Sequence, residues 1–300
     1  WISFCTYGMT GMVLAEAYFV PLSFLLCFYI LEREEVFKFD KQFFKRPINY
    51  VVIVIALLIA NNGIGYYPYF TCFILVVTGV CKWLKNKKPE GFVRALSICA
   101  VIAVFFILCM VPAKIYNLQH GANQDAVSRA GFIETEMYGL KLIMLFMPRN
   151  AHGIGIIQKA IDMYDSNTTY LNENVTEYLG IVAIIGFFIL MFTLFMNRDS
   201  ALKKRLGALS EINIMLVLLG TTSGLGTMIA FLITDKIRGY NRISIFIEYV
   251  CILAVAMLMG AIVDKLKADK RTASIIVTAV TGLVHPWYLC RHNCPYPALY

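Results

Sequence analysis

The chain has 300 residues, of which 59% are hydrophobic and 15% are charged, and its formal net charge is +8 at pH 7. Soluble domains carry about 25% charged residues, so this composition excludes an ordinary soluble fold. The basic residues stand in small clusters beside apolar blocks, which is typical of membrane orientation signals. We therefore expect membrane lipids as partners and no nucleic acid.

Apolar blocks separated by short charged stretches predict an all-α, polytopic transmembrane helical bundle with about eight membrane segments. The predicted segments are 10–31, 48–61, 67–83, 93–112, 178–196, 212–233, 244–264 and 272–285. The second and the last are shorter than the roughly 20 residues that cross a bilayer, so a re-entrant or partly immersed helix stays open for both. Residue 1 is Trp and the first block follows almost at once, so we expect the natural N-terminus to be missing.

Lys and Arg mark one side of the predicted bundle. The basic loops are 32–47, 82–94, 197–206 and 265–271. All four lie on one side if every segment crosses, and the positive-inside rule makes that side cytoplasmic. The resulting regions are N-terminal membrane segments (1–112), one large extracytoplasmic loop (113–177), C-terminal membrane segments (178–285) and an atypical tail (286–300).

The cysteines and the tail carry no metal signature. The nine cysteines are irregularly spaced and most lie in apolar stretches, which indicates buried thiols without a disulfide framework. Two Cys and two His lie between 285 and 294, but without the paired spacing of a structural zinc site. The abrupt change in composition after 285 suggests a truncated or frame-shifted end.

The loop 113–177 is too apolar for a disordered linker, and two interpretations stay open. It either forms a polar cap on the bundle or faces a substrate. In the second case Glu134 and Glu136 bind hydroxyls or a divalent metal ion, and Arg149 or His152 faces a phosphate. The stretch 137–147 is predicted as an interfacial helix, with Lys141 snorkelling to the headgroups.

Two carboxylates precede the segment 178–196. Glu173 and Glu177 are one helical turn apart at a predicted helix start. Carboxylates at this position favour the helix macrodipole, so capping alone would explain both.

Two motifs follow in the C-terminal membrane segments. The run Gly220-Thr221-Thr222-Ser223-Gly224-Leu225-Gly226-Thr227 superficially suggests a phosphate loop, but close helix packing through small residues is favoured and a locally broken helix is the alternative. The segment 235–242 places basic residues on the side where the orientation rule disfavours them. Arg238 and Arg242 are four residues apart and would share a face if helical, as interfacial anchors or as an anion site.

Four scattered motifs between residues 60 and 264 share a resemblance. They are Gly65-Tyr66-Tyr67-Pro68-Tyr69-Phe70; Glu136-Met137-Tyr138-Gly139-Leu140-Lys141 with Leu145, Pro148 and His152; Asn172-Glu173 with Tyr178-Leu179-Gly180; and Ile237-Arg238-Gly239-Tyr240-Asn241-Arg242. This set resembles bacterial polytopic sugar-transfer proteins, which are labelled sugar translocases, phosphoglycerol transferases or GT-C-type membrane glycosyltransferases.

The resemblance implies transfer of a sugar, or a related group, from a polyprenyl-phosphate-linked donor to a glycan or lipid acceptor outside the bacterial cytoplasmic membrane. The substrate-binding candidates are Arg238, Tyr240, Asn241, Arg242, Lys141, Arg149, His152 and Glu173. In GT-C enzymes the principal acidic residue usually lies in the first external loop, so the catalytic base is not assigned; Glu134 and Glu136 are candidates.

Two other functional classes stay open. A lipid-linked-sugar flippase or transporter should place ionisable residues near mid-membrane, and the predicted segments are nearly free of them away from their ends. A non-catalytic membrane scaffold would need no external polar residues, so the Glu, Arg and His of the external loops weigh against it. A sugar-transfer enzyme is therefore the main prediction.

Overall fold

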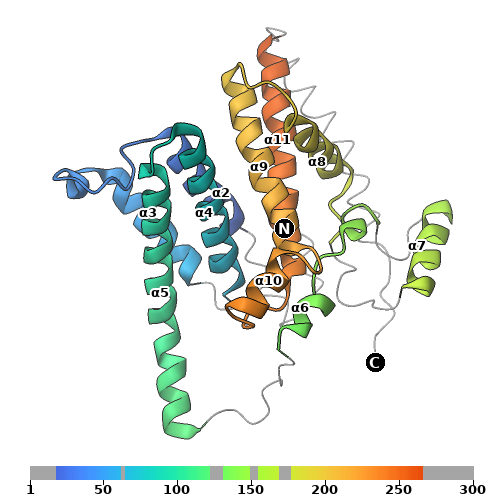
Figure 1. Ribbon diagram of the computed structural model, residues 1–300, viewed down its shortest axis with the longest axis horizontal. Helices are drawn as coiled ribbons and strands as arrows, with labels where there is room; N and C mark the ends of the chain where they lie inside the picture. Colours follow the sequence, from blue (N-terminus) through green and yellow to red (C-terminus); the bar gives the residue numbers. More distant parts are fainter. Residues whose placement is uncertain (1–17, 62–64, 122–130, 149–154, 169–176, 266–300) are drawn as a thin grey trace. The chain divides into compact units, whose positions relative to one another are not determined.

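The computed structural model describes residues 18–61, 65–121, 131–148, 155–168 and 177–265. Every regular element in these residues is a helix, and the single β-bridge among them, between Leu140 and Thr221, is isolated. The predicted all-α class is therefore confirmed. The chain forms two compact units, Trp1–Ala130 and Gly131–Tyr300, whose helices are labelled in Figure 1.

Three helical stretches are long and apolar enough to cross a membrane. They are α4 (Tyr66–Asn86), α5 (Glu90–His120) and the stretch Tyr240–Lys265, which joins η6 (Tyr240–Ile243) to α11 (Ser244–Lys265). Shorter apolar helices are α2 (Phe19–Glu32), α3 (Pro47–Ala60) and α8 (Ile181–Thr193). At 1.5 Å per residue, a helix as short as α3 is about 21 Å long, less than the roughly 30 Å hydrocarbon core. The membrane character is thus present, while the count of eight crossings stays a prediction, and segment 272–285 lies outside the described residues.

The first unit gathers its basic loops at one end. The side chain of Arg94, on α5, is buried and donates to the carbonyl oxygens of Arg33 at 2.6 Å and Val36 at 3.2 Å, just beyond α2. Lys82 Nζ, on α4, donates to the carbonyl oxygens of Ile30 at 2.8 Å and Leu31 at 3.0 Å. Cations stabilise the carbonyl groups that a helix C-terminus leaves unpaired. The start of α5 is thereby fixed against the end of α2.

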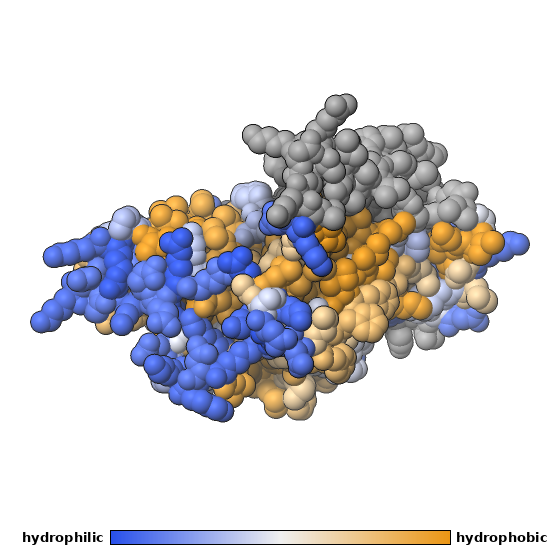
Figure 2. Space-filling model, turned by 90° about the horizontal axis from the view of Figure 1, so that it is seen from above, coloured by the Kyte–Doolittle hydropathy of each residue, from blue (hydrophilic) through white to orange (hydrophobic). Residues whose placement is uncertain are grey.

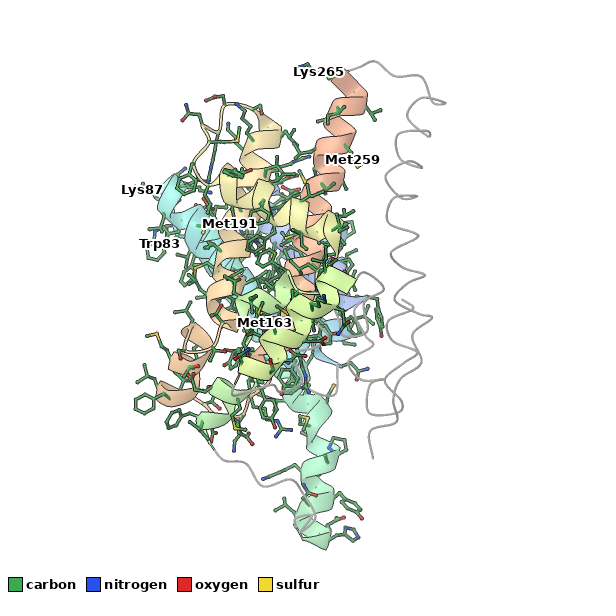
Figure 3. All side chains as sticks on the ribbon, turned by 90° about the vertical axis from the view of Figure 1, so that its right-hand side faces the viewer. Trp83, Lys87, Met163, Met191, Met259 and Lys265 are labelled. Carbon is green, nitrogen blue, oxygen red and sulfur yellow. The ribbon has the colours of Figure 1, made fainter. Side chains whose placement is uncertain are left out.

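The second unit is built on α8, α9 (Ala201–Gly220) and α11, which lie side by side. Because α9 and α11 run in opposite directions (Figure 1), the start of α9 and Lys265, at the end of α11 labelled in Figure 3, lie at the same end of the unit. That end carries Lys203 and Lys204 in the first turn of α9, which is capped by Ser200 Oγ accepting from the Lys203 backbone N–H at 3.2 Å. The segments between α9 and α11 lie at the opposite end.

Gly186 sets the distance between α8 and α11. A Cβ atom at this position would collide with the Cys251 carbonyl group, so the helices touch through backbone atoms, as small residues allow. We expect Gly186→Ala to destabilise the protein by about 1–3 kcal/mol, as overpacking does. The apparent melting temperature in detergent measures this. Gly260→Ala is the matched control, because a Cβ there meets nothing within 4 Å; equal melting of both variants would contradict the contact.

Two predicted helical stretches differ from the structure. α5 continues past residue 112, the predicted start of the external loop, to His120, with Pro112 inside it. The prediction of one interfacial helix over 137–147 is wrong. α6 (Ile133–Met137) ends at the start of this stretch, residues 138–141 form no helix, and the short 3₁₀ helix η4 (Leu142–Leu145) follows. The reason is that the backbone of Leu140 pairs with α9, which a continuous helix would prevent.

Large apolar side chains are exposed on the outer faces of several helices. Examples are Val54 on α3, Ile107 on α5 and Phe188 on α8, which are 56%, 63% and 49% exposed. Figure 2 shows broad apolar areas beside hydrophilic ones on one face of the molecule. Soluble monomers rarely expose large contiguous apolar patches, so these outer faces suit contact with lipid chains.

Candidate functional site

A break in the helical structure creates the framework of the site. The span predicted over 212–233 is not one helix, because α9 ends at Gly220 and α10 (Leu225–Leu232) begins after four residues. Thr221 adopts an extended conformation, and Ser223 has a φ of 59°. The alternative of a locally broken helix is therefore confirmed. Close packing is nevertheless present, because a Cβ on Gly226 would lie 2.7 Å from the Tyr240 ring.

The broken segment pairs with the strap, our name for residues 138–141. The Leu140 backbone N–H donates to the Gly220 carbonyl at 2.7 Å, and the Thr222 N–H donates to the Leu140 carbonyl at 3.1 Å. The first bond satisfies the Gly220 carbonyl, a group that the end of α9 would otherwise leave unpaired. Gly139 is needed for the approach, because a Cβ there would lie 2.8 Å from Thr222 Oγ1.

Arg238 lies over the strap and contacts α6. Its guanidinium carbon is 5.2 Å from the centroid of the Tyr138 ring, and its Nη1 is 3.4 Å from Glu134 Oε1. The Arg238 side chain is 30% exposed, whereas that of Glu134 is 8% exposed. The Asn241 backbone N–H donates to the Tyr138 carbonyl at 3.1 Å and fixes the segment against the strap. A cation–π contact and a long ion pair therefore hold a guanidinium group that still reaches solvent.

Glu136 points to a different partner. Ser223 Oγ, in the helix break, donates to Glu136 Oε2 at 2.7 Å. Nearby, Thr135 Oγ1 donates to Thr227 Oγ1 on α10 at 3.3 Å, and α6 and α10 are in contact at the lower end of the second unit in Figure 1. Glu134 and Glu136 thus lie on one short helix but face separate groups.

Glu177 is a buried acid that precedes α8. Glu177 is only 3% exposed, and neither of its carboxyl oxygens has a hydrogen-bond partner among the described residues. Burial raises the pKa of Glu177 to about 9, and the facing Asn241 amide and the charge of Lys141 lower it in part. The Asn241 side chain is a neighbour of this carboxyl group but does not complete a hydrogen bond with it. At neutral pH the acid is therefore protonated.

The capping interpretation of Glu177 is wrong. α8 begins at Ile181 after Gly180, so Glu177 lies outside the helix and makes no capping hydrogen bond. A carboxylate that complements a macrodipole lies within the first turn and faces solvent, whereas this one is buried beside the strap. Glu173, its predicted companion, lies outside the described residues.

The structure brings together most of the predicted site residues that it describes. Glu134, Lys141, Arg238 and Asn241 lie on or against the strap, and Glu136 contacts Ser223 in the helix break next to it. Tyr240 is 1% exposed and packs on Gly226, so packing explains it. The positions of Arg149 and His152 lie outside the described residues.

Arg238 and Arg242 do not share a face of one helix, as they would if their segment were helical. Residues 235–239 form no helix, and Arg242 lies in the short 3₁₀ helix η6, which begins at Tyr240. The four-residue spacing therefore does not align the two side chains as an α-helix would. Arg238 lies over the Tyr138 ring of the strap and contacts Glu134.

Glu177, Thr222 and Ser223 were noted in the sequence but were not predicted as site residues. For Glu177, the available signal was a carboxylate directly before an apolar segment. This pattern is the same for a buried acid and for a helix cap, so it does not distinguish them. Among the described residues, no group of three or more His, Cys, Asp or Glu side chains is arranged to hold a metal ion. The two carboxylates of α6 offer no such group, since one faces Arg238 and the other Ser223.

Comparison with known proteins gives no family for the chain. No protein-family model matches it, and neither a curated protein nor a solved structure does. The resemblance to sugar-transfer proteins therefore depends on the motifs alone.

Proposed function

We propose that the protein is a membrane glycosyltransferase that transfers a sugar, or a related group, from a polyprenyl-phosphate-linked donor on the extracytoplasmic face, in cell-envelope glycan assembly. The observation that carries this proposal is the position of Arg238. Its side chain is 30% exposed, and its guanidinium makes one hydrogen bond within the described residues, at 3.4 Å to Glu134. A planar guanidinium group suits a phosphate, which it binds through pairs of oxygens.

The chemistry requires positive charge at the leaving phosphate. An enzyme outside the cytoplasm has no nucleotide sugar, so a membrane-borne activated donor is its energy source. When the glycosidic bond to the phosphate breaks, negative charge develops on the phosphate oxygens, and a preorganised cation stabilises it. Arg238 is held for this purpose by Glu134 and Tyr138.

The acceptor hydroxyl requires a base. Glu136 is the better candidate, because its carboxylate is held by Ser223 and is not committed to a cation in the described residues. A carboxylate within hydrogen-bond reach of the acceptor removes its proton as the new bond forms. Glu134, which contacts Arg238, is then a positioning residue.

The proposed topology has eight crossings with the site on the external side of a bacterial cytoplasmic membrane. It is supported by the location of Lys203 and Lys204 at the end of the second unit opposite to the helix break. Fusions to alkaline phosphatase after residues 87 and 204 should be inactive and those after residue 160 active, because this enzyme folds only after export. Fusions to green fluorescent protein should give the reverse pattern. Phosphatase activity after residue 204 would overturn the orientation.

The function is tested by transfer in proteoliposomes. The full chain should move a labelled sugar from a polyprenyl-phosphate donor to membrane-lipid or glycan acceptors, and the Glu134→Gln/Glu136→Gln double variant should lose about 100-fold or more of that rate, as loss of a general base and its neighbour does. Insertion should stay intact. Wild-type protein that turns over no donor would refute the enzyme, and unchanged turnover in the double variant would exclude both carboxylates from the transfer reaction.

A further inference from the structure

Buried polar atoms without partners are concentrated around the strap. Six buried side-chain oxygen or nitrogen atoms in the described part of the chain lack a hydrogen bond, and five of them belong to Glu134, Glu177, Thr222 and Asn241. Each of these residues borders residues 138–141: Glu134 through Arg238, Thr222 and Asn241 through backbone hydrogen bonds, and Glu177 through Asn241 and Lys141. Native proteins pair nearly all buried polar groups, so such a concentration points to a ligand.

The chemistry of these atoms defines the ligand class. All five are oxygen atoms of carboxyl, amide or hydroxyl groups, and the carboxyl and amide oxygens accept hydrogen bonds. Acceptor oxygens repel a phosphate. These five oxygen atoms therefore suit a different part of a ligand from the part that the Arg238 guanidinium suits. A protonated Glu177 also offers one O–H donor and carries no charge to attract a cation. Sugar hydroxyls, which both donate and accept, match this set.

We propose that Glu177, Thr222 and Asn241 form a buried subsite that binds the hydroxyl groups of a sugar ring. This inference rests on the proposed function and names the part of the donor that the Arg238 guanidinium does not hold. The proposal assigns the lipid phosphate to Arg238 and the sugar hydroxyls to Glu177, Thr222 and Asn241.

The unpartnered polar atoms of the subsite should cost stability. A buried polar group without a partner is destabilising, and its replacement by an apolar or neutral group of similar shape is neutral or stabilising. Thr222→Val and Glu177→Leu should therefore melt at or above the temperature of the wild-type protein without ligand. A residue with only a structural role would lower stability when removed, so melting separates the two explanations.

The test compares two probes on the full chain in lipid nanodiscs: farnesyl phosphate, and farnesyl phosphate esterified to glucose, galactose or mannose. Wild-type protein should bind at least one sugar-bearing probe about tenfold or more tightly than farnesyl phosphate, a ratio that a few hydrogen bonds supply. Glu177→Leu and Thr222→Val should reduce that preference about three- to tenfold each and leave farnesyl phosphate binding unchanged. Glu177→Gln, which keeps a neutral hydrogen-bonding group, should retain most of it.

Asn213→Leu is the matched control. Its amide nitrogen is the sixth unpartnered atom, and it lies in α9 away from the strap; both probes should bind this variant as they bind the wild type. If all Glu177 and Thr222 variants keep the wild-type sugar preference, the subsite is refuted while the donor class stands. If the wild-type protein binds neither probe, the proposed function fails and the subsite for its sugar fails with it.

Discussion

Arg238→Ala should lower the rate of sugar transfer by about 100-fold or more, as the loss of one preorganised donor to a developing anion does in other enzymes. Affinity for farnesyl phosphate should fall as well, because the guanidinium would contact the phosphate before and during the reaction. Arg238→Lys should recover little, since an ammonium group keeps the charge but loses the planar fork and the contact over the Tyr138 ring. Initial rates in proteoliposomes and donor affinities in nanodiscs measure both effects.

Arg198→Ala is a matched control for Arg238. Arg198 has a similar side-chain exposure, 27% against 30%, and its Nη1 is 2.6 Å from Glu211 Oε1. It lies next to the start of α9, at the basic end of the second unit, whereas the helix break lies at the opposite end. Its loss should leave transfer and donor affinity unchanged. Wild-type transfer by Arg238→Lys, or wild-type donor affinity in Arg238→Ala, would make Arg238 an interfacial anchor.

Periodic apolar blocks predicted the helices well, because burial in lipid or in a helical bundle requires a continuous apolar stretch. The segments 67–83 and 244–264 correspond closely to α4 and α11. The same signal failed at 212–233, where the hydropathy of residues 225–232 continues that of α9. A break of four residues hardly changes the mean hydropathy of such a stretch, so its location depends on the turn-forming Thr, Ser and Gly residues and on their distant partners.

The strap could not be predicted because its partners are distant in the sequence. Leu140 pairs with Gly220 and Thr222, about eighty positions later, and no local pattern encodes that contact. Residues 137–147 show apolar spacing that suits an interfacial helix, but backbone pairing with α9 prevents one. Tertiary contacts commonly override local propensity in this way.

Glu177 shows the same limit at the level of one side chain. A Glu before an apolar helix is typical of an N-terminal cap, and the sequence gives no sign that the chain turns this residue inward. Arg238 and Glu134 were each predicted as site residues, but their ion pair joins positions 104 residues apart. The sequence therefore identified most of the polar residues and left their pairing to the structure.

Glu177→Gln should change how stability depends on pH. The pKa of Glu177 is about 9 in the folded protein against 4.5 without burial. Below pH 4.5 both folded and unfolded states hold the proton, so the raised pKa gives no penalty. As pH rises above that value the unfolded state loses its proton first, and the free energy of unfolding of the wild type falls by up to about 1.4 kcal/mol per pH unit until the folded state also ionises.

The wild-type protein and Glu177→Gln should therefore have similar stability near pH 4.5, and the variant should become the more stable of the two as pH rises toward 9. The difference at pH 7 should be on the order of 3 kcal/mol, and apparent melting temperatures in detergent from pH 5 to 9 measure it. Asp162→Asn, which removes an exposed carboxylate from α7 (Gly155–Asn167), should follow the wild-type curve. The wild type and Glu177→Gln share every other titrating group, so only the buried acid can separate their two curves. Parallel curves for the wild type and Glu177→Gln would mean that Glu177 ionises normally, and a neutral hydrogen-bonding acid beside the strap would then be ruled out.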